Sequence, residues 1–382
     1  IITEVMYHPY HSETRPEDVN AEYIELFNRG TGPVNLSGWR ISNGVDFVLP
    51  DVTLGAGEFF VIAANVDTFN ANYPSINNVV GGWSGRLSNK GDAIEILDNV
   101  GVRIDRVDYA DEGDWAVREL GPLELGHRGW MWAIAHDGGG KSLELLNANM
   151  PNDYGQNWTA SDQDNGTPGM INSVAVENVA PFILDAIHTP IVPTENEAVA
   201  ITARIIDELR TGIKVILHYR ADVSVYEGQD IYPHHEPDNY IHVTMFDDGT
   251  HGDGAADDEI YGAQIPAQQD GTIIEFYIEA SDAVGYWRTW PAPSIVDGIP
   301  EQVTNALYQV NSSFDGDVTW VPGRQPIYYL IMTEMERGRL EYIGTHSTLY
   351  GPDSQMNTTF ISADGVDMKV CYNLGMRTIP HS

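Results

Sequence analysis

Short alternating segments separated by glycine- and proline-containing turns constrain the fold of this chain most strongly. Residues 22–28 (EYIELFN) place Ile24 and Leu26 on one face, and tyrosine, glutamate and phenylalanine on the other. This period of two is typical of a β-strand. Residues 28–33 (NRGTGP) supply the glycine and proline of a tight turn, and residues 34–39 (VNLSGW) add a short strand ending on a large aromatic. The order predicts the beginning of a small β-sandwich.

The same residues, preceded by residues 1–9 (IITEVMYHP), resemble the bacterial lamin tail domain, an immunoglobulin-like (Ig-like) module. The later matching segments are 46–50 with 54–63 as a hairpin, 66–74 as a short helical crossover, 87–98 with 104–109 as a strand pair, and a closing block at 141–146, 157–158, 161 and 166–169. The resemblance implies an Ig-like sandwich over residues 1–173, with 111–140 as an extended inserted loop. It also implies a binding or scaffolding role without an active site.

The length and composition predict more than one packed domain. A chain of 382 residues is too long for one sandwich, and a hydrophobic content of 42% is ample for packed cores. With 37 glycines and 21 prolines between short strands, we expect an all-β protein. The expected fold is tandem Ig-like β-sandwiches followed by a partial α+β C-terminal segment. The single cysteine, Cys371, excludes an internal disulfide framework.

The charge balance is strongly acidic. Twenty basic residues, only four of them lysines, face 56 acidic ones, for a net charge of −36. Such a surface repels nucleic-acid phosphates and anionic lipids, so we expect no nucleic-acid partner. We also expect no membrane span, because the most apolar run, residues 59–64, has only the length of a strand. The acidity suits a protein that meets divalent cations or high salt; alternatively it only keeps the protein soluble.

A second sandwich is predicted after a linker at residues 174–181. Half-buried strands are expected at residues 198–205, 213–220, 241–246, 259–265 and 272–280. Their number and spacing within residues 182–312 predict an Ig-like or fibronectin-like sandwich. The segment 275–282 resembles the late strand of such modules in secreted bacterial proteins.

The remaining residues, 313–382, have a different pattern. A strand is expected at 326–333, helix-forming residues at 334–342, and further strands at 357–361 and 370–377. In this order they resemble the beginning of the CotH-like kinase family. The nucleotide- and metal-binding carboxylates expected later in that family have no counterpart here, and residues 378–382 depart from its pattern. The resemblance therefore implies an incomplete domain, and we expect no enzymatic activity from this chain alone.

The densest carboxylate cluster lies at residues 247–259 (DDGTHGDGAADDE). Calcium prefers several hard oxygen ligands on a tight, glycine-bearing loop, so we predict a calcium site here. The predicted ligands are Asp247, Asp248, Asp253, Asp257 and Asp258. The loop is not an EF-hand, because Gly249 and His251 occupy its third and fifth positions. The alternative is a hairpin loop whose aspartates bond their own backbone.

Two other motifs receive structural explanations. His234 and His235, with Glu236 and Asp238, could bind zinc only in an irregular loop, because adjacent strand residues face opposite ways. We expect exposed loop histidines instead. Residues 138–142 (GGGKS) look like the end of a phosphate-binding loop, but a required glycine is missing and an alternating strand follows. We expect a glycine turn into a closing strand.

Catalytic constellations are not evident in the sequence. No Gly-x-Ser-x-Gly motif occurs, and Cys371 has no indicated base partner. Acidic pairs such as Glu22 with Glu25 and Asp105 with Asp108 are expected by chance in so acidic a chain. We expect such strand carboxylates on the solvated face.

Aromatic side chains are the other recognition feature. Those in or beside the inserted loop, or after the last strong strand of the second sandwich, are Trp115, Trp130, Trp132, Tyr154, Trp287 and Trp290. Exposed tryptophans on sandwich loops can stack on sugars or enter a neighbouring subunit. Alternatively, they close domain ends or form an interdomain contact. Exposed strand edges add the option of assembly into fibres or layers.

Together these features predict a secreted, non-catalytic, structural or adhesive modular protein of the bacterial cell surface or extracellular matrix. Protein–protein contacts or self-association into a filament or layer are expected, with calcium rigidifying the second sandwich. The alternatives are the N-terminal part of an exported CotH-like kinase and a carbohydrate-binding module. Export is inferred from the family resemblance and composition, because no signal peptide is visible; we expect a mature or trimmed product.

Overall fold

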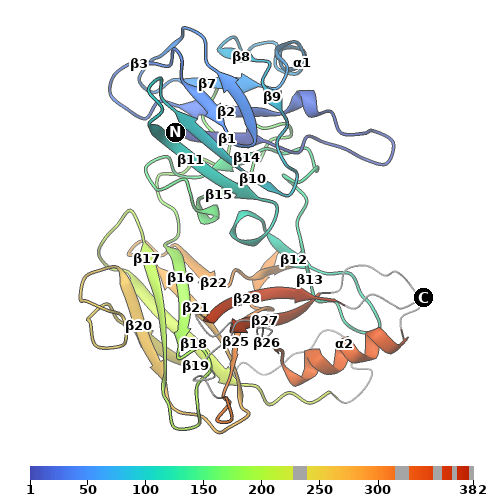
Figure 1. Cartoon of the computed structure of the whole chain (residues 1–382), viewed down its shortest axis with the longest axis vertical. Coiled ribbons are helices and arrows are strands. Elements are labelled where there is room, and N and C mark those ends of the chain that lie inside the picture. The colour runs from blue at the N-terminus through green and yellow to red at the C-terminus, as the bar shows by residue number, and fades with distance from the viewer. Residues whose placement is uncertain (227–238, 315–326, 347–354, 364–367, 378–382) are drawn as a thin grey trace, which may run out of the picture. The chain divides into compact units, whose positions relative to one another are not determined.

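The structure, a computed structural model, describes residues 1–382 except 227–238, 315–326, 347–354, 364–367 and 378–382. Its contacts divide the chain into two compact units (Figure 1). The first unit is Ile1–Val117 with Trp132–Val179, and the second unit is Arg118–Met131 with Ala180–Ser382. Strands predominate in both, as predicted, and the described residues contain two α-helices.

The first unit is an Ig-like sandwich of two main sheets. One sheet contains, in spatial order, β15 (Trp158–Ala160), β14 (Leu143–Leu145), β1 (Ile2–Met6), β2 (Tyr23–Phe27), β7 (Phe59–Ala63) and β8 (Val79–Gly81). The other contains β11 (Arg103–Ala110), β10 (Gly91–Leu97), β4 (Arg40–Ser42), β5 (Val45–Val48) and β9 (Ser84–Gly85). Smaller elements are the pair β3 (Val34–Asn35) and β6 (Thr53–Leu54), and the 3-10 turns η1 (Val19–Ala21), η2 (Gly113–Trp115) and η3 (Gly155–Asn157).

Both faces of strand β2 are covered by other parts of the first unit. Ile24 and Leu26 are buried in the core between the two sheets. On the opposite face, Tyr23 packs edge-on against Phe69 of helix α1 (Val66–Asn72), with ring centroids 5.8 Å apart. Asn65 caps this helix by accepting the Thr68 N–H at 2.9 Å, which is typical N-cap geometry. The predicted helical crossover is therefore confirmed.

One predicted pairing in this unit is wrong. We expected residues 46–50 and 54–63 to form a hairpin, but β5 pairs with β4 and β9, whereas β7 pairs with β2 and β8. The chain crosses from one sheet to the other between them, and Leu49 and Leu54 are buried in the core on the way. The predicted pair at β10 and β11 is confirmed.

The second unit contains another sandwich. One sheet is formed by β16 (Phe182–Thr189), β17 (Val199–Ile206) and β20 (Ile260–Ile265). The facing sheet is formed by β19 (Ile241–Met245), β18 (Lys214–Ala221), β21 (Ile273–Ser281), β22 (Trp287–Trp290) and β25 (Ala306–Gln309). In β17 every second residue is buried, which explains the alternation in the sequence.

Two further sheets belong to the second unit. The first joins β13 (Trp130–Trp132), β12 (Arg118–Leu120), β23 (Ser294–Val296) and β24 (Ile299–Glu301), with β12 parallel to β23. The second joins β26 (Ile327–Ile331), β27 (Met356–Ala363) and β28 (Met368–Met376), and is accompanied by helix α2 (Glu334–His346). Leu307 of β25 packs with Ile331 and Ile361, so this C-terminal sheet shares a small core with the sandwich.

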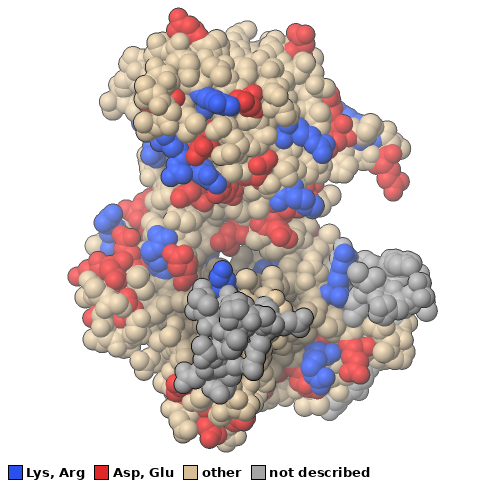
Figure 2. Space-filling view, in the orientation of Figure 1, with Lys and Arg blue, Asp and Glu red and all other residues tan. Residues whose placement is uncertain are grey.

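On the face drawn in Figure 2, charged side chains of both signs lie at many separate places. Figure 2 shows acidic side chains on the visible faces of both units, with basic side chains interspersed among them. Several basic side chains form exposed ion pairs, such as Arg40 with Asp46 at 2.7 Å. Pairs this exposed contribute little to stability, because water and salt screen them.

Candidate functional site

The acidic loop predicted to bind calcium connects β19 to β20 of the second sandwich. It narrows at an isolated bridge between Asp248 and Ala256. Asp253 is buried, with 1% of its surface exposed, whereas Asp257 and Asp258 are exposed. The five predicted ligands therefore lie in one loop but in different environments.

Asp253 organises the loop through backbone hydrogen bonds. Its Oδ2 accepts the N–H groups of Asp248 at 2.8 Å and Gly249 at 2.7 Å, and its Oδ1 accepts that of His251 at 2.9 Å. Burial alone would raise the pKa of Asp253, but these backbone donors outweigh it and lower the pKa. The carboxylate is thus an internal clasp for the turn.

Most of the other aspartates also bond to the loop itself. Asp247 accepts the N–H groups of Asp258 at 3.1 Å and Glu259 at 2.9 Å. Asp248 accepts the N–H and the hydroxyl of Thr250 at 2.9 and 2.7 Å. Among the described residues no group of three or more His, Cys, Asp or Glu side chains is arranged to hold a metal ion. This geometry favours the self-bonded loop, and calcium binding stays a prediction.

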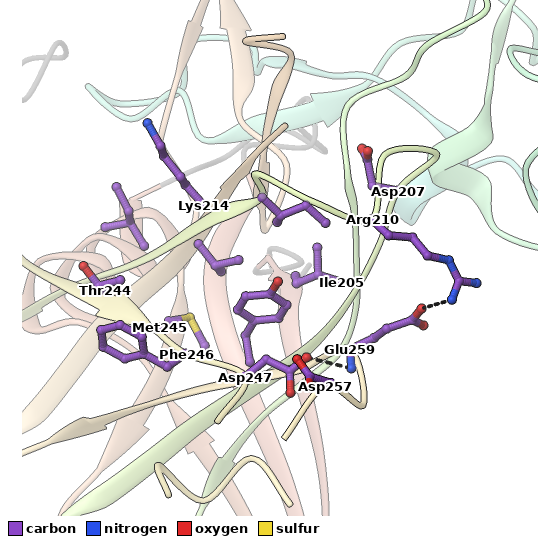
Figure 3. A pocket seen from close by; sticks show the side chains of 14 residues that line it. Ile205, Asp207, Arg210, Lys214, Thr244, Met245, Phe246, Asp247, Asp257 and Glu259 are labelled. Carbon is purple, nitrogen blue, oxygen red and sulfur yellow. Dashed lines mark hydrogen bonds and ion pairs between the residues drawn. The ribbon is translucent and has the colours of Figure 1, made fainter. Parts of the chain in front are cut away.

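A cavity of about 620 Å³ lies beside the acidic loop (Figure 3). Strands of both sheets line it, β17 and β20 from one and β18 and β19 from the other. Its apolar lining consists of Ile205, Ile213, Val215, Ile216, Met245, Phe246 and the ring of Tyr261. Phe246 is 47% exposed, so part of this lining is in contact with solvent.

The charged lining of this cavity is mostly acidic. It comprises Asp207, Asp247, Asp257 and Glu259, against Arg210 and Lys214. In Figure 3, Asp247, Asp257 and Glu259 lie close together, with Lys214 across from them. Arg210 pairs with Glu259 at 3.8 Å.

Burial and neighbouring carboxylates raise the pKa values of two groups that line the cavity. Burial, followed by the charges of Asp247, Glu259 and Asp257, raises the pKa of the Tyr261 hydroxyl. Burial raises the pKa of Asp207 to about 6, and its Oδ2 has no hydrogen-bond partner. The cavity therefore combines an apolar lining with excess negative charge, which suits a cation on an apolar stem.

The structure also places the other predicted residues. The possible zinc ligands His234, His235, Glu236 and Asp238 lie outside the described residues. The glycine turn at 138–142 leads into β14, as predicted. Cys371 is exposed on β28.

The predicted aromatic residues are divided between the two units and differ in burial. Trp287 and Trp290 lie on β22 rather than in a loop, which corrects the prediction; the segment continues the sheet by pairing with β21. Trp287 is 52% exposed, whereas Trp290 packs against the core of the sandwich. Trp115 lies in η2 and packs against Trp158 of the first core, and Trp130 is buried on β13.

Sequence reasoning missed a row of buried glutamates in the first unit. Glu4 of β1 lies opposite Glu25 of β2 and Glu144 of β14, and all three are completely buried. Glu22, just before β2, is also buried, so the expectation that Glu22 and Glu25 lie on a solvated face is wrong. The closing segment, residues 165–174, covers this face of the sheet, and alternation within a strand gives no sign of a cover so distant in sequence.

The closing segment is tied to these glutamates by hydrogen bonds. The backbone N–H of Thr167 donates to Glu4 at 2.9 Å, and its hydroxyl donates to Glu144 at 2.7 Å. The N–H of Gly169 donates to Glu25 at 2.6 Å. The Gly-Thr-Pro-Gly block noted in the sequence therefore serves to close the domain over its own carboxylates.

Burial shifts the titration of these groups. It raises the pKa of Glu4 to about 7, although hydrogen bonds from Ser142 and Tyr23 oppose the shift. It also raises the pKa of Glu22 to about 8 and that of Glu25 well above its usual range. These carboxyls hold protons at a pH where ordinary glutamates are ionised.

Comparison with known families finds two matches. Residues 1–111 match the lamin tail domain, and residues 235–281 match the second Ig-like domain of conditioned medium factor. No curated protein matches the chain. Among the described residues no helix combines the length and apolarity needed to cross a membrane. The chain is thus similar to Ig-like modules in both units, and its fold is that of tandem Ig-like β-sandwiches.

Proposed function

We propose that this chain is a non-catalytic structural or adhesive protein of the bacterial cell surface or extracellular matrix. Its second sandwich would hold a partner protein by a basic side chain. The observation that supports this function is the cavity beside the acidic loop, which joins an apolar lining to excess carboxylates. The occupant is an exposed lysine or arginine side chain on the partner.

The chemistry of the cavity matches that occupant. Met245 and Phe246 offer apolar surface for the aliphatic stem of a lysine or arginine. Asp247 and Asp257 can then receive the charged end, and the ring of Tyr261 can contribute a cation–π contact. The net charge of −36 would draw a basic partner toward the surface before docking.

The extracellular location is part of the proposal. It rests on the resemblance of residues 141–169 to the closing segment of secreted bacterial lamin tail domains, and residues 1–111 match the lamin tail domain itself. The name of the second matched family, conditioned medium factor, also refers to a factor of the medium around cells. Fractionation of the producing cells, with antibodies against the chain, tests the location directly.

The docking proposal is tested by calorimetry with a blocked peptide of alternating alanine and lysine. We expect binding at low salt that weakens as salt rises, because the contact is partly ionic. A double variant, Asp257→Asn with Glu259→Gln, should weaken binding about tenfold. A control of equal charge, Glu195→Gln with Asp51→Asn, changes exposed carboxylates elsewhere and should leave binding close to that of the wild type.

Two outcomes would contradict docking at this cavity. One is equal weakening by both double variants, which would indicate attraction by net charge alone. The other is no binding of the lysine peptide at low salt. Self-association into filaments or layers is a separate part of the proposal, and sedimentation velocity at rising protein concentration tests it.

A second candidate function is that of the N-terminal part of an exported CotH-like kinase. It is favoured by the C-terminal sheet β26–β27–β28 with helix α2, whose described strands pair with one another and with no strand of the sandwich sheets. The test is nucleotide binding: measurable affinity of this chain for magnesium ATP would favour the kinase. Its absence would favour the structural function for the residues present.

A further inference from the structure

A second cavity, of about 840 Å³, lies in the second unit away from the acidic loop. Its walls come from the segment between β12 and β13, from sandwich strands β18 and β21, from residues near β24, and from α2 with β27. Its volume is in the range typical of small-molecule sites. None of the residues predicted to bind metal lines it.

One wall of this cavity is a fixed polar network. Arg220 Nε donates to Glu275 Oε2 at 2.6 Å, and only 14% and 9% of the two side chains are exposed. Asn305 Nδ2 donates to Glu275 Oε1 at 2.6 Å and to the Tyr240 hydroxyl at 2.8 Å. The Arg220 guanidinium also lies over the Tyr240 ring, 4.6 Å from its centre. These groups are held in place before any ligand arrives.

Two residues next to this network carry buried polar atoms without partners. Asn357 donates its Nδ2 to the Asn305 carbonyl at 2.8 Å, but its Oδ1 accepts no hydrogen bond. Glu336 of α2 accepts the backbone N–H of Asn357, and its Oε2 is buried without a partner. Buried polar atoms are normally satisfied, so two lining residues that carry unpartnered polar atoms favour a polar ligand for this cavity.

The charge state of the cavity narrows the class of ligand. Burial, reinforced by the negative charge of Glu275, raises the pKa of Glu336 to about 8. Glu336 is therefore mostly neutral at pH 7 and can donate a hydrogen bond from its carboxyl. Glu275 is already balanced by Arg220. The cavity thus offers a donor at Glu336 and an acceptor at Asn357. Its other charged lining residues, Arg128 and Arg339 against Asp297 and Glu301, are equal in number and opposite in sign, so they add no net charge to attract an ion.

The cavity also contains aromatic surface. The rings of Tyr240 and Tyr277 line it, with centroids 5.1 Å apart in an edge-to-face arrangement, and Trp130 lines it from the β13 side. Aromatic rings beside paired donors and acceptors suit a ligand that has apolar C–H faces and many hydroxyls. A sugar ring has both.

We propose that this cavity binds a neutral saccharide, with Glu336 and Asn357 hydrogen-bonding its hydroxyls and Tyr240 and Tyr277 contacting its ring. This inference is independent of the docking of basic side chains, because the two cavities share no lining residue. Together the two sites would let one sandwich join a polysaccharide to a protein.

Saturation-transfer difference NMR on the full chain tests the proposal. The probes are cellotriose, mannotriose, maltotriose and tri-N-acetylchitotriose, with trigalacturonate as a charged comparison. We expect transfer to at least one neutral trisaccharide and none to trigalacturonate. Glu336→Leu removes the carboxyl and should weaken binding about tenfold or more, whereas Glu336→Gln keeps a donor and should stay within about threefold.

Controls separate loss of the site from loss of the fold. Each variant is checked by thermal unfolding, and Asp257→Asn in the other cavity should bind the sugar like the wild type. The proposal is overturned if no neutral trisaccharide receives saturation, if trigalacturonate alone binds, or if a folded Glu336→Leu protein binds as tightly as the wild type.

Discussion

At the scale of single residues, the first unit depends on carboxyl groups that water does not reach. Glu4, Glu25 and Glu144 lie side by side across three strands and are completely buried. Three adjacent buried negative charges would repel strongly, and raised pKa values let some of the groups stay protonated instead. Hydrogen bonds from Thr167 and Gly169 then stabilise the arrangement.

This arrangement predicts stability that falls as pH rises. The pKa of Glu4 is raised from 4.5 to about 7 in the folded protein, so the folded state binds more protons over that window. Its stabilising contribution is full below about pH 4.5 and is lost as pH rises through about 7, at about 1.4 kcal/mol per pH unit. Glu22, with a pKa of about 8, extends the window upward. Chemical unfolding followed between about pH 5 and about pH 8 measures this slope.

The variant Glu4→Gln provides the control, because an amide does not titrate. We expect it to make the fall in stability with pH shallower, whereas Asp51→Asn on the surface should leave the slope unchanged. A slope identical in Glu4→Gln and the wild type would rule out Glu4 as its source.

The acidic loop gives a second prediction at this scale. Asp253 accepts three backbone N–H groups and is buried, so Asp253→Ala should cost about 1–3 kcal/mol of unfolding free energy. Asp257 has a left-handed φ of 62°, a conformation that asparagine tolerates, so Asp257→Asn should change stability by less than about 0.5 kcal/mol. Urea titration of both variants distinguishes the internal clasp from the exposed carboxylate.

Calcium binding is tested on the same two positions. If the loop binds calcium, terbium added in its place should bind and become luminescent. The double variant Asp253→Ala with Asp257→Ala should abolish this luminescence. If the protein shows no luminescence and gains no thermal stability with calcium, the loop does not bind calcium. Hydrogen bonds to the loop's own backbone would then account for its aspartates.

At the scale of elements, the C-terminal sheet and the second sandwich share a small core. Ile361 of β27 is completely buried against Leu307 of β25 and Ile331 of β26. Met332, Ile343 and Met356 form a second cluster beneath α2. Because β25 also pairs with β21, the sandwich sheet that contains β25 and the C-terminal sheet β26–β27–β28 are expected to unfold together.

This predicts that Ile361→Ala destabilises the sandwich as well as the C-terminal sheet. Loss of a fully buried isoleucine should cost about 2–5 kcal/mol. Hydrogen exchange should show loss of protection in β25 as well as in β27. The matched control is Ile327→Ala on β26, whose side chain is 45% exposed and should have a small effect. Loss of protection confined to β26–β28 would show that the sheet is only loosely attached.

At the scale of the whole molecule, net charge is the dominant electrostatic feature. A charge of −36 destabilises the folded chain through self-repulsion that dissolved ions screen. We expect the melting temperature to rise as sodium chloride increases from about 10 mM to about 500 mM, over which the screening length shortens several-fold. The melting temperatures in sodium sulfate and in calcium chloride, each at equal ionic strength, are compared with those in sodium chloride. A melting temperature independent of salt would mean that the charges are too well dispersed to matter.

The sequence alone determined the class of fold and most of the strands. The alternation in Val199–Ile206 depends only on which residues face the core, so the sequence pattern alone predicts strand β17. Helix α2 was predictable from its helix-forming residues, and the pair β10–β11 from its resemblance to the late strand pair of the lamin tail domain. The acidic loop was recognisable as a unit because its aspartates and glycines are contiguous.

Only the tertiary structure decided what covers each face and which strands meet. Alternation cannot show that residues 165–174 close over Glu4, Glu25 and Glu144, so the buried Glu25 was expected on a solvated face. Similarly, nothing local shows that β5 and β7 join different sheets. The two cavities follow the same rule, because their walls combine strands and loops far apart in the chain. The burial of a side chain and the pairing of a strand each depend on a second segment that packs against it. A short-range pattern describes only the first segment, so it cannot identify the second.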